Sequence, residues 1–227
     1  MPSMAGEPAH LVEMRVKGVY WDGERIYTRN SVPGDSVYGE RLITSNEIEY
    51  REWMPNRSKL AAYVRLGGTV FPFSKDTRVL YLGAASGTTA SHVADLCHGG
   101  TVYCVEFSPR SFRDLVSVCE RRKNMVPILG DATRPSEYRF AVEHVEVVYQ
   151  DIAQKNQASI MLKNMREFAA KKGMLALKAR CEDVTREPRS IFSEAATFIS
   201  KEGFEVLDML DLEPFEKDHA MLAVGAK

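Results

Sequence analysis

The sequence lacks several features that define particular classes of protein. Its four cysteines form no C-x-x-C pair, which argues against a zinc site or a redox motif, and three of them lie in predicted helices or strands. We interpret them as packed thiols of a reducing compartment, and no metal site is expected. No apolar stretch is long enough to span a membrane and the first residues do not resemble a signal peptide, so a cytoplasmic protein without a membrane partner is expected.

A large net charge is also absent. The 30 basic and 31 acidic residues are interspersed and give a formal net charge of −1, so no strong overall field attracts the protein to a polyanion. A nucleic-acid substrate would therefore be held mainly by other components. The 227 residues, of which 44% are apolar, suffice for one substantial core with a small appended unit.

The amino-terminal part of the chain is typical of a small β structure. Residues 1–9 are small and polar, and a flexible terminus is predicted there. Residues 10–54 predict a small N-terminal β domain, with a hairpin on Asp22-Gly23 and a second extended pair at 40–44 and 48–53. Because so small a unit is marginal alone, we expect it to pack on the main domain, residues 55–227.

The main domain has the pattern of an α/β fold. A helix is expected over 53–68, starting near Asn56 or Ser58 and ending at Gly67-Gly68. Strands and helices then alternate, which predicts a mostly parallel sheet with helices on both faces and an antiparallel last pair of strands. The predicted strands are 78–83, 101–106, 126–130, 145–150, 173–179, 204–210 and 219–225, and the predicted helices are 88–97, 109–122, 154–170 and 188–202.

The stretch 78–95 combines a strand, a tight turn that starts at Gly83 and a helix that begins at Thr88. Small residues let backbone N–H groups approach a ligand, and the start of a helix attracts negative charge. Similar turns also occur in α/β domains that bind nothing there. The residues 84–86, Ala-Ala-Ser, stand where the dinucleotide pattern G-x-G-x-x-G has its second glycine, which disfavours NAD.

Acidic residues end the next two predicted strands. Glu106 lies about twenty residues beyond the turn, where a carboxylate binds a nucleotide ribose in doubly wound folds. Asp131 follows the strand after that, between Gly130 and Ala132. Small or acidic residues at three successive strand ends predict a ligand that contains a nucleoside.

Two charged residues end the following strands. Asp151 ends the apolar run VEVVYQ, with Gln154 one helical turn further on, and Lys178 ends the run GMLAL. A lysine at the end of a buried strand is unfavourable unless it is paired, so a pair with Asp151 is predicted. The pair is either a structural ion pair or, at the ligand edge of the sheet, a device for tuning a proton transfer.

Six motifs occur in order along the chain, and the segment NRSKLAA precedes them. They are LYLGAASGTTASHVAD, VYCVEFSPR, GDATRP, YQDIAQ, LALKAR and EKDHAMLAVG. With them the chain closely resembles fibrillarin, and more narrowly the archaeal fibrillarin-like rRNA/tRNA 2′-O-methyltransferases, which lack a Gly/Arg-rich tail. The resemblance implies a Rossmann-like class I methyltransferase that uses S-adenosyl-L-methionine, with a seven-stranded sheet and a small N-terminal β unit.

The resemblance also implies which residues bind the cofactor. Thr88 and Thr89 would lie near its methionine carboxylate and Gln154 at the methionine end, whereas Glu106 would bind the ribose hydroxyls and Phe107 the adenine. For Phe107 the alternative is ordinary core packing, and for Thr88 it is an N-cap. The full implied set is Gly83, Ala85, Thr88, Thr89, Glu106, Phe107, Asp131, Ala132, Asp151 and Gln154.

Lys59, Asp151, Lys178 and His219 are the catalytic set that the resemblance implies. The residues themselves favour Asp151 and Lys178, support Lys59 more weakly and suggest only a strand-start histidine at position 219. In the resulting hypothesis Lys178, held by Asp151, contacts the ribose hydroxyl, while Lys59 places the ribose or its phosphate. His219 would orient or stabilise the cluster.

By resemblance, the expected function is 2′-O-methylation of rRNA, and of tRNA as a further target, directed by a box C/D guide RNA in a ribonucleoprotein. The implied partners are a Nop-domain scaffold protein (Nop5/Nop56/58-like) and, through it, an L7Ae-type kink-turn protein. The near-zero net charge fits an enzyme to which other components deliver the target. The alternatives are a methyltransferase for a protein glutamine or a small molecule, and a scaffold without catalytic activity.

Overall fold

A small antiparallel sheet forms the amino-terminal part of the fold. The computed structural model describes residues 11–227, so the predicted flexible segment 1–9 lies outside the described residues. The strands follow the order β1-β2-β3-β5-β4, and the β2–β3 hairpin turns at the predicted Asp22-Gly23. Asp22 Oδ1 accepts backbone N–H bonds from Glu24 and Arg25, which stabilises that turn. The strands are β1 (Val12–Glu13), β2 (Val19–Trp21), β3 (Ile26–Arg29), β4 (Leu42–Ser45) and β5 (Ile48–Glu52).

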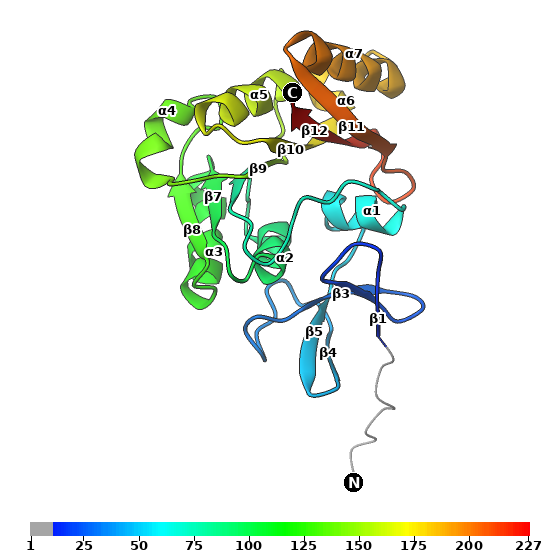
Figure 1. The fold of residues 1–227 in the computed structure, drawn as a ribbon, viewed down its shortest axis with the longest axis vertical. Helices are drawn as coiled ribbons and strands as arrows, with labels where there is room; N and C mark the ends of the chain where they lie inside the picture. Colours follow the sequence, from blue (N-terminus) through cyan, green and yellow to red (C-terminus); the bar gives the residue numbers. More distant parts are fainter. Residues whose placement is uncertain (1–10) are drawn as a thin grey trace.

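The second sheet has seven strands in the order β11-β12-β10-β9-β6-β7-β8 (Figure 1). β12 is antiparallel to both of its neighbours, while β10, β9, β6, β7 and β8 are mutually parallel. The α/β class, the seven strands and the antiparallel last strand are thereby confirmed. The strands are β6 (Val79–Leu82), β7 (Val102–Glu106), β8 (Met125–Leu129), β9 (Val147–Gln150), β10 (Lys172–Lys178), β11 (Phe204–Asp211) and β12 (His219–Ala226).

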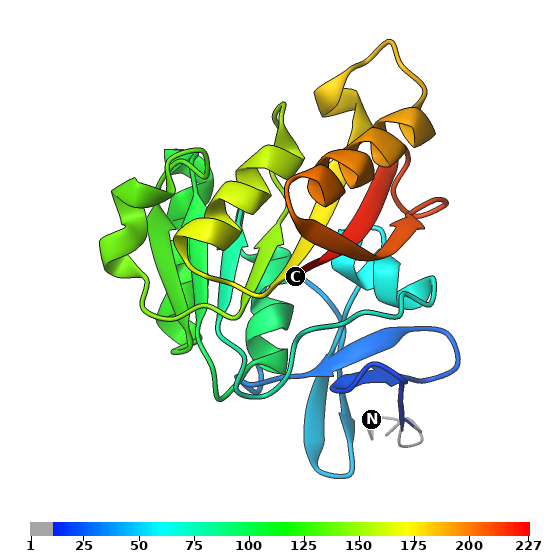
Figure 2. The same ribbon diagram turned by 45° about the horizontal axis from the view of Figure 1, so that its top comes forward.

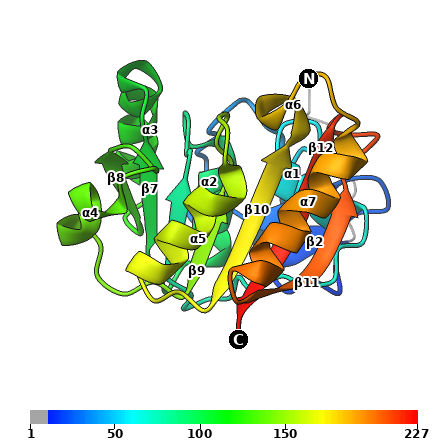
Figure 3. The same ribbon diagram turned by 90° about the horizontal axis from the view of Figure 1, so that it is seen from above.

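Helices cover both faces of this sheet, as predicted (Figures 2 and 3). On one face α1, α2 and α3 share an apolar core with the N-terminal sheet, and on the other α4, α5 and α7 pack in a second core. The helices are α1 (Lys59–Arg65), α2 (Thr88–Leu96), α3 (Pro109–Arg121), α4 (Pro135–Tyr138), α5 (Gln157–Glu167), α6 (Ala179–Glu182) and α7 (Pro188–Lys201), with a 3-10 turn at Arg139–Ala141.

Two predicted helices are shorter in the structure. The helix expected over 53–68 begins at Lys59, because Ser58 is its N-cap and Trp53 lies at the end of the N-terminal sheet. The helix expected over 154–170 begins at Gln157, because Asn156 has a left-handed φ of 61° that cannot continue a helix. Neither α4 nor α6 was predicted, since four-residue helices carry no measurable periodicity.

A buried polar cluster fixes the small sheet to the main one. Arg51 of β5 is fully buried, and its guanidinium contacts Glu40 at 2.7 Å and Asp95 of α2 at 2.8 Å. His92 of α2 lies nearby with its ring nitrogens 2.7 Å from Thr28 Oγ1 and 2.8 Å from the Tyr38 hydroxyl. The small unit therefore packs on the main one as expected, and the proposed domain boundary between residues 54 and 55 falls in the connection from β5 to α1.

Candidate active site

A cavity of about 370 Å³ opens at the carboxyl ends of the parallel strands. In open α/β sheets this edge is where ligands bind. Among the described residues no cluster of His, Cys, Asp or Glu could hold a metal ion, and no helix is long and apolar enough to cross a membrane. The predicted site residues that line the cavity are Gly83, Ala85, Glu106, Phe107, Asp131, Ala132, Asp151, Gln154 and Lys178.

The turn after β6 needs glycine at its first position. Gly83 has a φ of +81°, and a Cβ atom there would lie 2.5 Å from the backbone oxygen of Asp151. The chain can therefore bring β6 and β9 together beneath the cavity only where a side chain is absent. Ala85 also has a positive φ, of 49°, and its N–H donates to Glu106 Oε2 at 2.8 Å.

Glu106 is oriented by the backbone on both sides. One carboxylate oxygen accepts the Ala85 N–H, and the other accepts the Ser108 N–H at 2.7 Å. Because each carboxylate oxygen has two lone pairs, both can still accept a hydroxyl donor from the cavity. This geometry suits a ribose diol, the role that the sequence predicted.

Phe107 extends this site with an aromatic face. Its side chain is 72% exposed at the edge of the cavity, so the core-packing alternative is wrong. A large exposed aromatic ring beside a ribose-binding carboxylate is suited to stacking on a planar base. Asp131 lies in the same lining, and its Oδ1 accepts the N–H and the hydroxyl of Thr133, both at 2.8 Å.

The two predicted threonines lie outside the cavity lining. Thr89 is buried, and its hydroxyl donates to Ser58 Oγ at 3.0 Å. Thr88 is the first residue of α2, but the N-cap is Gly87, so the N-cap alternative for Thr88 is wrong. Neither threonine lines the cavity, and their contact with a methionine carboxylate stays a prediction.

Asp151 bridges two lysines. Its Oδ1 lies 2.7 Å from Lys178 Nζ and its Oδ2 lies 3.3 Å from Lys59 Nζ. The predicted pair of Asp151 with Lys178 is confirmed, and Lys59 joins it from the first position of helix α1. Each of the three side chains is 15% exposed, so all three are shielded from bulk water. Asp151 and Lys178 line the cavity, whereas Lys59 and His219 do not. One carboxylate thus pairs with two ammonium groups, one on each of its oxygens.

Lys59 reaches the carboxylate because helix α1 starts at a fixed point. Ser58, the N-cap, accepts hydrogen bonds at its Oγ from Trp53 Nε1 at 3.0 Å, from Thr89 and from the Ala61 N–H at 3.3 Å. The first helical residue therefore has a defined direction. A lysine in the first turn is unfavourable to the helix dipole, and its pairing with Asp151 offsets that disadvantage.

His219 begins β12, where it is the cross-strand neighbour of Lys178 in β10. Its Nδ1 lies 2.5 Å from the Lys217 carbonyl oxygen, so Nδ1 carries the hydrogen and Nε2 is left as an acceptor. Burial lowers the pKa of His219 below 6.5, and the charges of Lys59 and Lys178 lower it further. The imidazole is therefore neutral at pH 7.

Gln157 supports Lys178 in a way that sequence reasoning missed. Its side chain is fully buried, its Oε1 accepts the Lys178 N–H at 3.0 Å and its Nε2 donates to the Lys178 carbonyl at 3.0 Å. The Nε2 group also lies 3.1 Å from Glu182 Oε1. One amide thus satisfies both backbone groups at the end of β10. The only sequence signal was a glutamine at an apolar helix position.

Two tyrosines beneath Asp151 were also missed. Tyr81 and Tyr149 are the last residues but one of the neighbouring strands β6 and β9, are buried and have ring centroids 4.6 Å apart. Burial raises the pKa of both hydroxyls well above 10, and the negative charge of Asp151 adds to this, so both stay protonated. Both rings belong to the apolar core between the two sheets and do not line the cavity.

Known proteins similar to this chain share its arrangement. The sequence model of the family described as Fibrillarin matches residues 11–227. A fibrillarin-like rRNA/tRNA 2′-O-methyltransferase of Methanococcus maripaludis (strain C7) is 50% identical over 206 residues, which make up 89% of each chain. The solved structure of Aeropyrum pernix fibrillarin with natively bound S-adenosyl-L-methionine is 44% identical, with a TM-score of 0.86 over 95% of this chain and 97% of that one. A chain of a fibrillarin/Nop5p complex is 37% identical, with a TM-score of 0.87 over 95% of this chain and 100% of that one.

Proposed function

Because the chain belongs to the fibrillarin family, we propose that it transfers the methyl group of S-adenosyl-L-methionine to the 2′-hydroxyl of a ribose in rRNA, with tRNA as a further target. The observation that carries this proposal is the carboxylate of Asp151 between two lysines, beside a cavity that fits a nucleoside. The cofactor supplies a sulfonium whose methyl group is open to attack by an oxygen nucleophile.

The cavity fits the nucleoside part of that cofactor. Gly83 leaves room where a Cβ atom would collide with the next strand, Glu106 presents two carboxylate oxygens and Phe107 presents a ring face. We assign the ribose to Glu106, the adenine to Phe107, Asp131 and Ala132, and the methionine end to Gln154. Thr88 and Thr89 belong to the same proposal.

The reaction forms an O–CH₃ bond, breaks the S–CH₃ bond and releases the hydroxyl proton. Because a ribose hydroxyl is a weak nucleophile, much of the acceleration comes from holding its oxygen in line with the methyl–sulfur bond. Lys178 contacts that oxygen and stabilises the negative charge that develops as the proton leaves. Asp151 fixes the Lys178 ammonium at 2.7 Å, and Lys59 places the ribose or its phosphate.

His219 completes the set through its neutral form. With Nδ1 bonded to the Lys217 carbonyl, its Nε2 is an acceptor next to the Lys178 strand end. A neutral imidazole adds no positive charge to the two lysines, and it can accept a proton or a water hydrogen bond on the path by which the hydroxyl proton leaves. This role extends the orienting role expected from the sequence.

A Nop scaffold protein is the proposed partner, since a fibrillarin chain of the same fold occurs in a complex with Nop5p. We further propose that a box C/D guide RNA and an L7Ae-type kink-turn protein assemble with the chain through this scaffold. The proposed site of action is the cytoplasm. The near-balanced charge of the chain supports such an assembly, because other components would supply most of the affinity for RNA.

The test is transfer of a labelled methyl group to one guided ribose in the full assembly. Asp151→Ala and Lys178→Ala should each reduce the rate at saturating RNA by at least about 100-fold. Asp114→Ala and Lys201→Ala, at exposed positions of α3 and α7, are the matched controls and should act like the wild type. Wild-type rates in the first two variants would refute the assigned roles. Cofactor binding without guided transfer would point to a protein glutamine or a small molecule as acceptor.

A further inference from the structure

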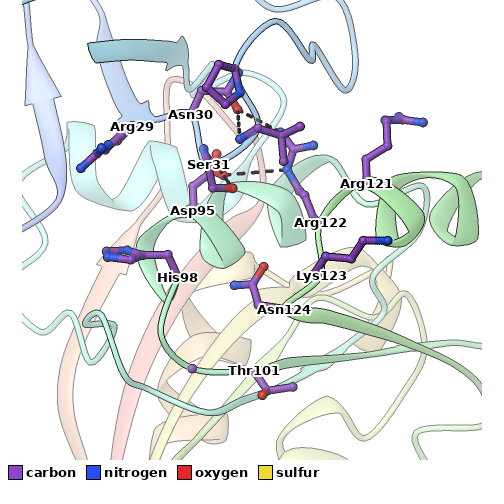
Figure 4. A pocket seen from close by; sticks show the side chains of 13 residues that line it. Arg29, Asn30, Ser31, Asp95, His98, Thr101, Arg121, Arg122, Lys123 and Asn124 are labelled. Carbon is purple, nitrogen blue, oxygen red and sulfur yellow. Dashed lines mark hydrogen bonds and ion pairs between the residues drawn. The ribbon is translucent and has the colours of Figure 1, made fainter. Parts of the chain in front are cut away.

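A second, larger cavity lies at the other edge of the seven-stranded sheet. Its volume is about 660 Å³, and its lining includes Gly100 and Thr101 just before β7 and Asn124 just before β8 (Figure 4). These are the amino ends of the strands whose carboxyl ends form the candidate active site. A five-residue strand such as β7 separates the two edges by roughly 17 Å.

This second cavity, which we call the basic pocket, is lined by several cationic side chains. Arg29, Arg121, Arg122 and Lys123 contribute to it, against the single carboxylate of Asp95. Within the described part of the chain, neither Arg29 nor Lys123 has a carboxylate within 4.0 Å, and both are exposed. Their charges therefore face the solvent without a protein counter-ion. Such a concentration contrasts with the near-zero net charge of the whole chain.

The negative charge of Asp95 is turned inward. Its Oδ1 accepts the Ser31 N–H at 3.1 Å, its Oδ2 contacts Arg51 at 2.8 Å and its side chain is fully buried. The buried Arg122 lies behind the same wall, 3.8 Å from Asp95 through Nε, and its Nε has no hydrogen-bond partner. Asp95 is thus paired inside the wall, and Asp35 pairs with Arg121 and Arg122, so the charges without a carboxylate partner at the opening are those of Arg29 and Lys123.

The chemistry of the lining selects the kind of ligand. Only Val32 and Pro33 are apolar, and the lining has no Phe, Tyr or Trp; the imidazole of His98 is its single aromatic ring. A protein partner needs large apolar or aromatic anchors, and a platform for successive bases needs several rings, so both are disfavoured. Arginine, lysine, asparagine and threonine side chains are the usual donors to phosphate oxygens.

We propose that the basic pocket binds the phosphate backbone of RNA, independently of sequence, as a second contact on the side opposite the active site. The inference rests on the proposed function, because an RNA acceptor places phosphates near this protein during the reaction. Arg29 and Lys123 are the contacting cations, and Arg121, partly neutralised by Asp35 at 2.8 Å, lies beside them.

The experiment measures binding of a fluorescent single-stranded RNA to the full-length chain between about 50 and 200 mM salt. The pocket variant is the double substitution Arg29→Gln/Lys123→Gln, and we expect it to bind RNA more weakly. The slope of log affinity against log salt concentration should become less negative by about 1.5, because each lost phosphate contact removes about 0.7 to 1 from it. Lys171→Gln/Lys201→Gln removes the same charge from exposed positions outside the pocket and should leave the slope unchanged.

The outcomes of these measurements separate the possibilities. An unchanged slope in the pocket variant, or an equal decrease in the control, overturns the proposal. If the pocket variant no longer binds a polyglutamate peptide but still binds RNA like the wild type, the proposal is also overturned, and an acidic protein segment becomes the ligand of the pocket. Guided methylation in the full assembly gives the independent readout: the pocket variant should raise the KM for RNA and keep the kcat of the wild type. A wild-type assembly without any transfer would refute the proposed function and leave the binding result standing.

Discussion

At the scale of single residues, the exposed Phe107 gives the sharpest test of cofactor binding. Its ring packs on little of the protein, so Phe107→Ala should leave the free energy of unfolding within about 0.5 kcal/mol of the wild type. If the ring stacks on adenine, the affinity for S-adenosyl-L-methionine should fall by about 1–3 kcal/mol, roughly 5- to 150-fold. Calorimetric titration measures this.

The chain offers a matched control for that variant. Phe140 is 90% exposed and does not line the cavity, so Phe140→Ala removes an equally exposed ring outside the site and should keep the wild-type affinity. Equal affinities in the two variants would show that Phe107 does not contact the cofactor.

Gln157 tests whether the support of Lys178 matters for the reaction. Gln157→Ala leaves the buried N–H and carbonyl of Lys178 without partners, which should destabilise the protein by about 1–3 kcal/mol. Because the Lys178 side chain is then poorly oriented, kcat should fall at least about 10-fold while the KM for the cofactor changes little.

A second variant, Gln157→Glu, keeps the acceptor for the Lys178 N–H but places a carboxylate oxygen against the Lys178 carbonyl and Glu182 Oε1. Because the donor is lost and the two carboxylates repel each other, kcat should be as low as that of the alanine variant or lower. A kcat equal to that of the wild type in folded Gln157→Ala would reduce the role of Gln157 to stability alone. Steady-state kinetics of guided transfer decide between the two.

At the scale of elements, helix α2 joins the two sheets through a histidine that cannot easily become charged. Burial lowers the pKa of His92 far below 6.5, and the charges of Arg51 and Arg122 lower it further. The unfolded chain binds this proton below about pH 6.5 and the folded chain does not, so stability is complete above pH 6.5 and is lost as the pH falls. Between pH 6.5 and 5 the loss from His92 should be about 2 kcal/mol.

Denaturant unfolding at pH 7 and pH 5 measures that loss. His92→Gln should show a smaller decrease than the wild type, whereas His98→Gln, at an exposed position two residues beyond α2, should show the wild-type decrease. The comparison isolates one histidine from the carboxylates that also titrate. If His92→Gln lost as much stability as the wild type, the pH dependence would have another source.

The sequence predicted the elements whose signals are local. The turn at Gly83, the N-cap Ser58 and the strands that end in Asp151 and Lys178 all lie where composition and periodicity placed them. Within the segment 53–68 the start was left open between Asn56 and Ser58, and the structure places it at Ser58, so the residues from Trp53 to Arg57 are outside the helix. Element ends depend on tertiary contacts, which a local pattern does not contain.

The supporting residues of the site could not be predicted in the same way. Gln157 meets Lys178 across 21 positions of sequence, and the partner that Ser58 finds in Thr89 lies 31 positions away. The basic pocket joins segments near residues 30, 100 and 122. None of these contacts has a fixed sequence spacing, so only the fold reveals them.

At the scale of the whole molecule, the two sheets form a cooperative pair. The core on one face of the large sheet includes Ile26 and Trp53 of the small unit together with Tyr81 and Tyr149 of the large one. The ion pairs of Arg51 with Glu40 and Asp95 lie at this junction between the small sheet and the main domain and are fully buried. Because opening the junction would expose these charges and this apolar surface together, we expect neither unit to unfold alone.

The chain provides separate signals for this prediction. Both of its tryptophans, Trp21 and Trp53, belong to the small sheet or its end, so tryptophan fluorescence reports on that unit. Far-ultraviolet circular dichroism is dominated by the helices, all of which follow β5 among the described residues. The two denaturation curves should have the same midpoint and slope. A fluorescence transition at a lower denaturant concentration would mean that the small sheet detaches first. In that state the hydrogen bond from Trp53 to Ser58, which fixes the start of α1, would be lost, and Lys59 would separate from Asp151.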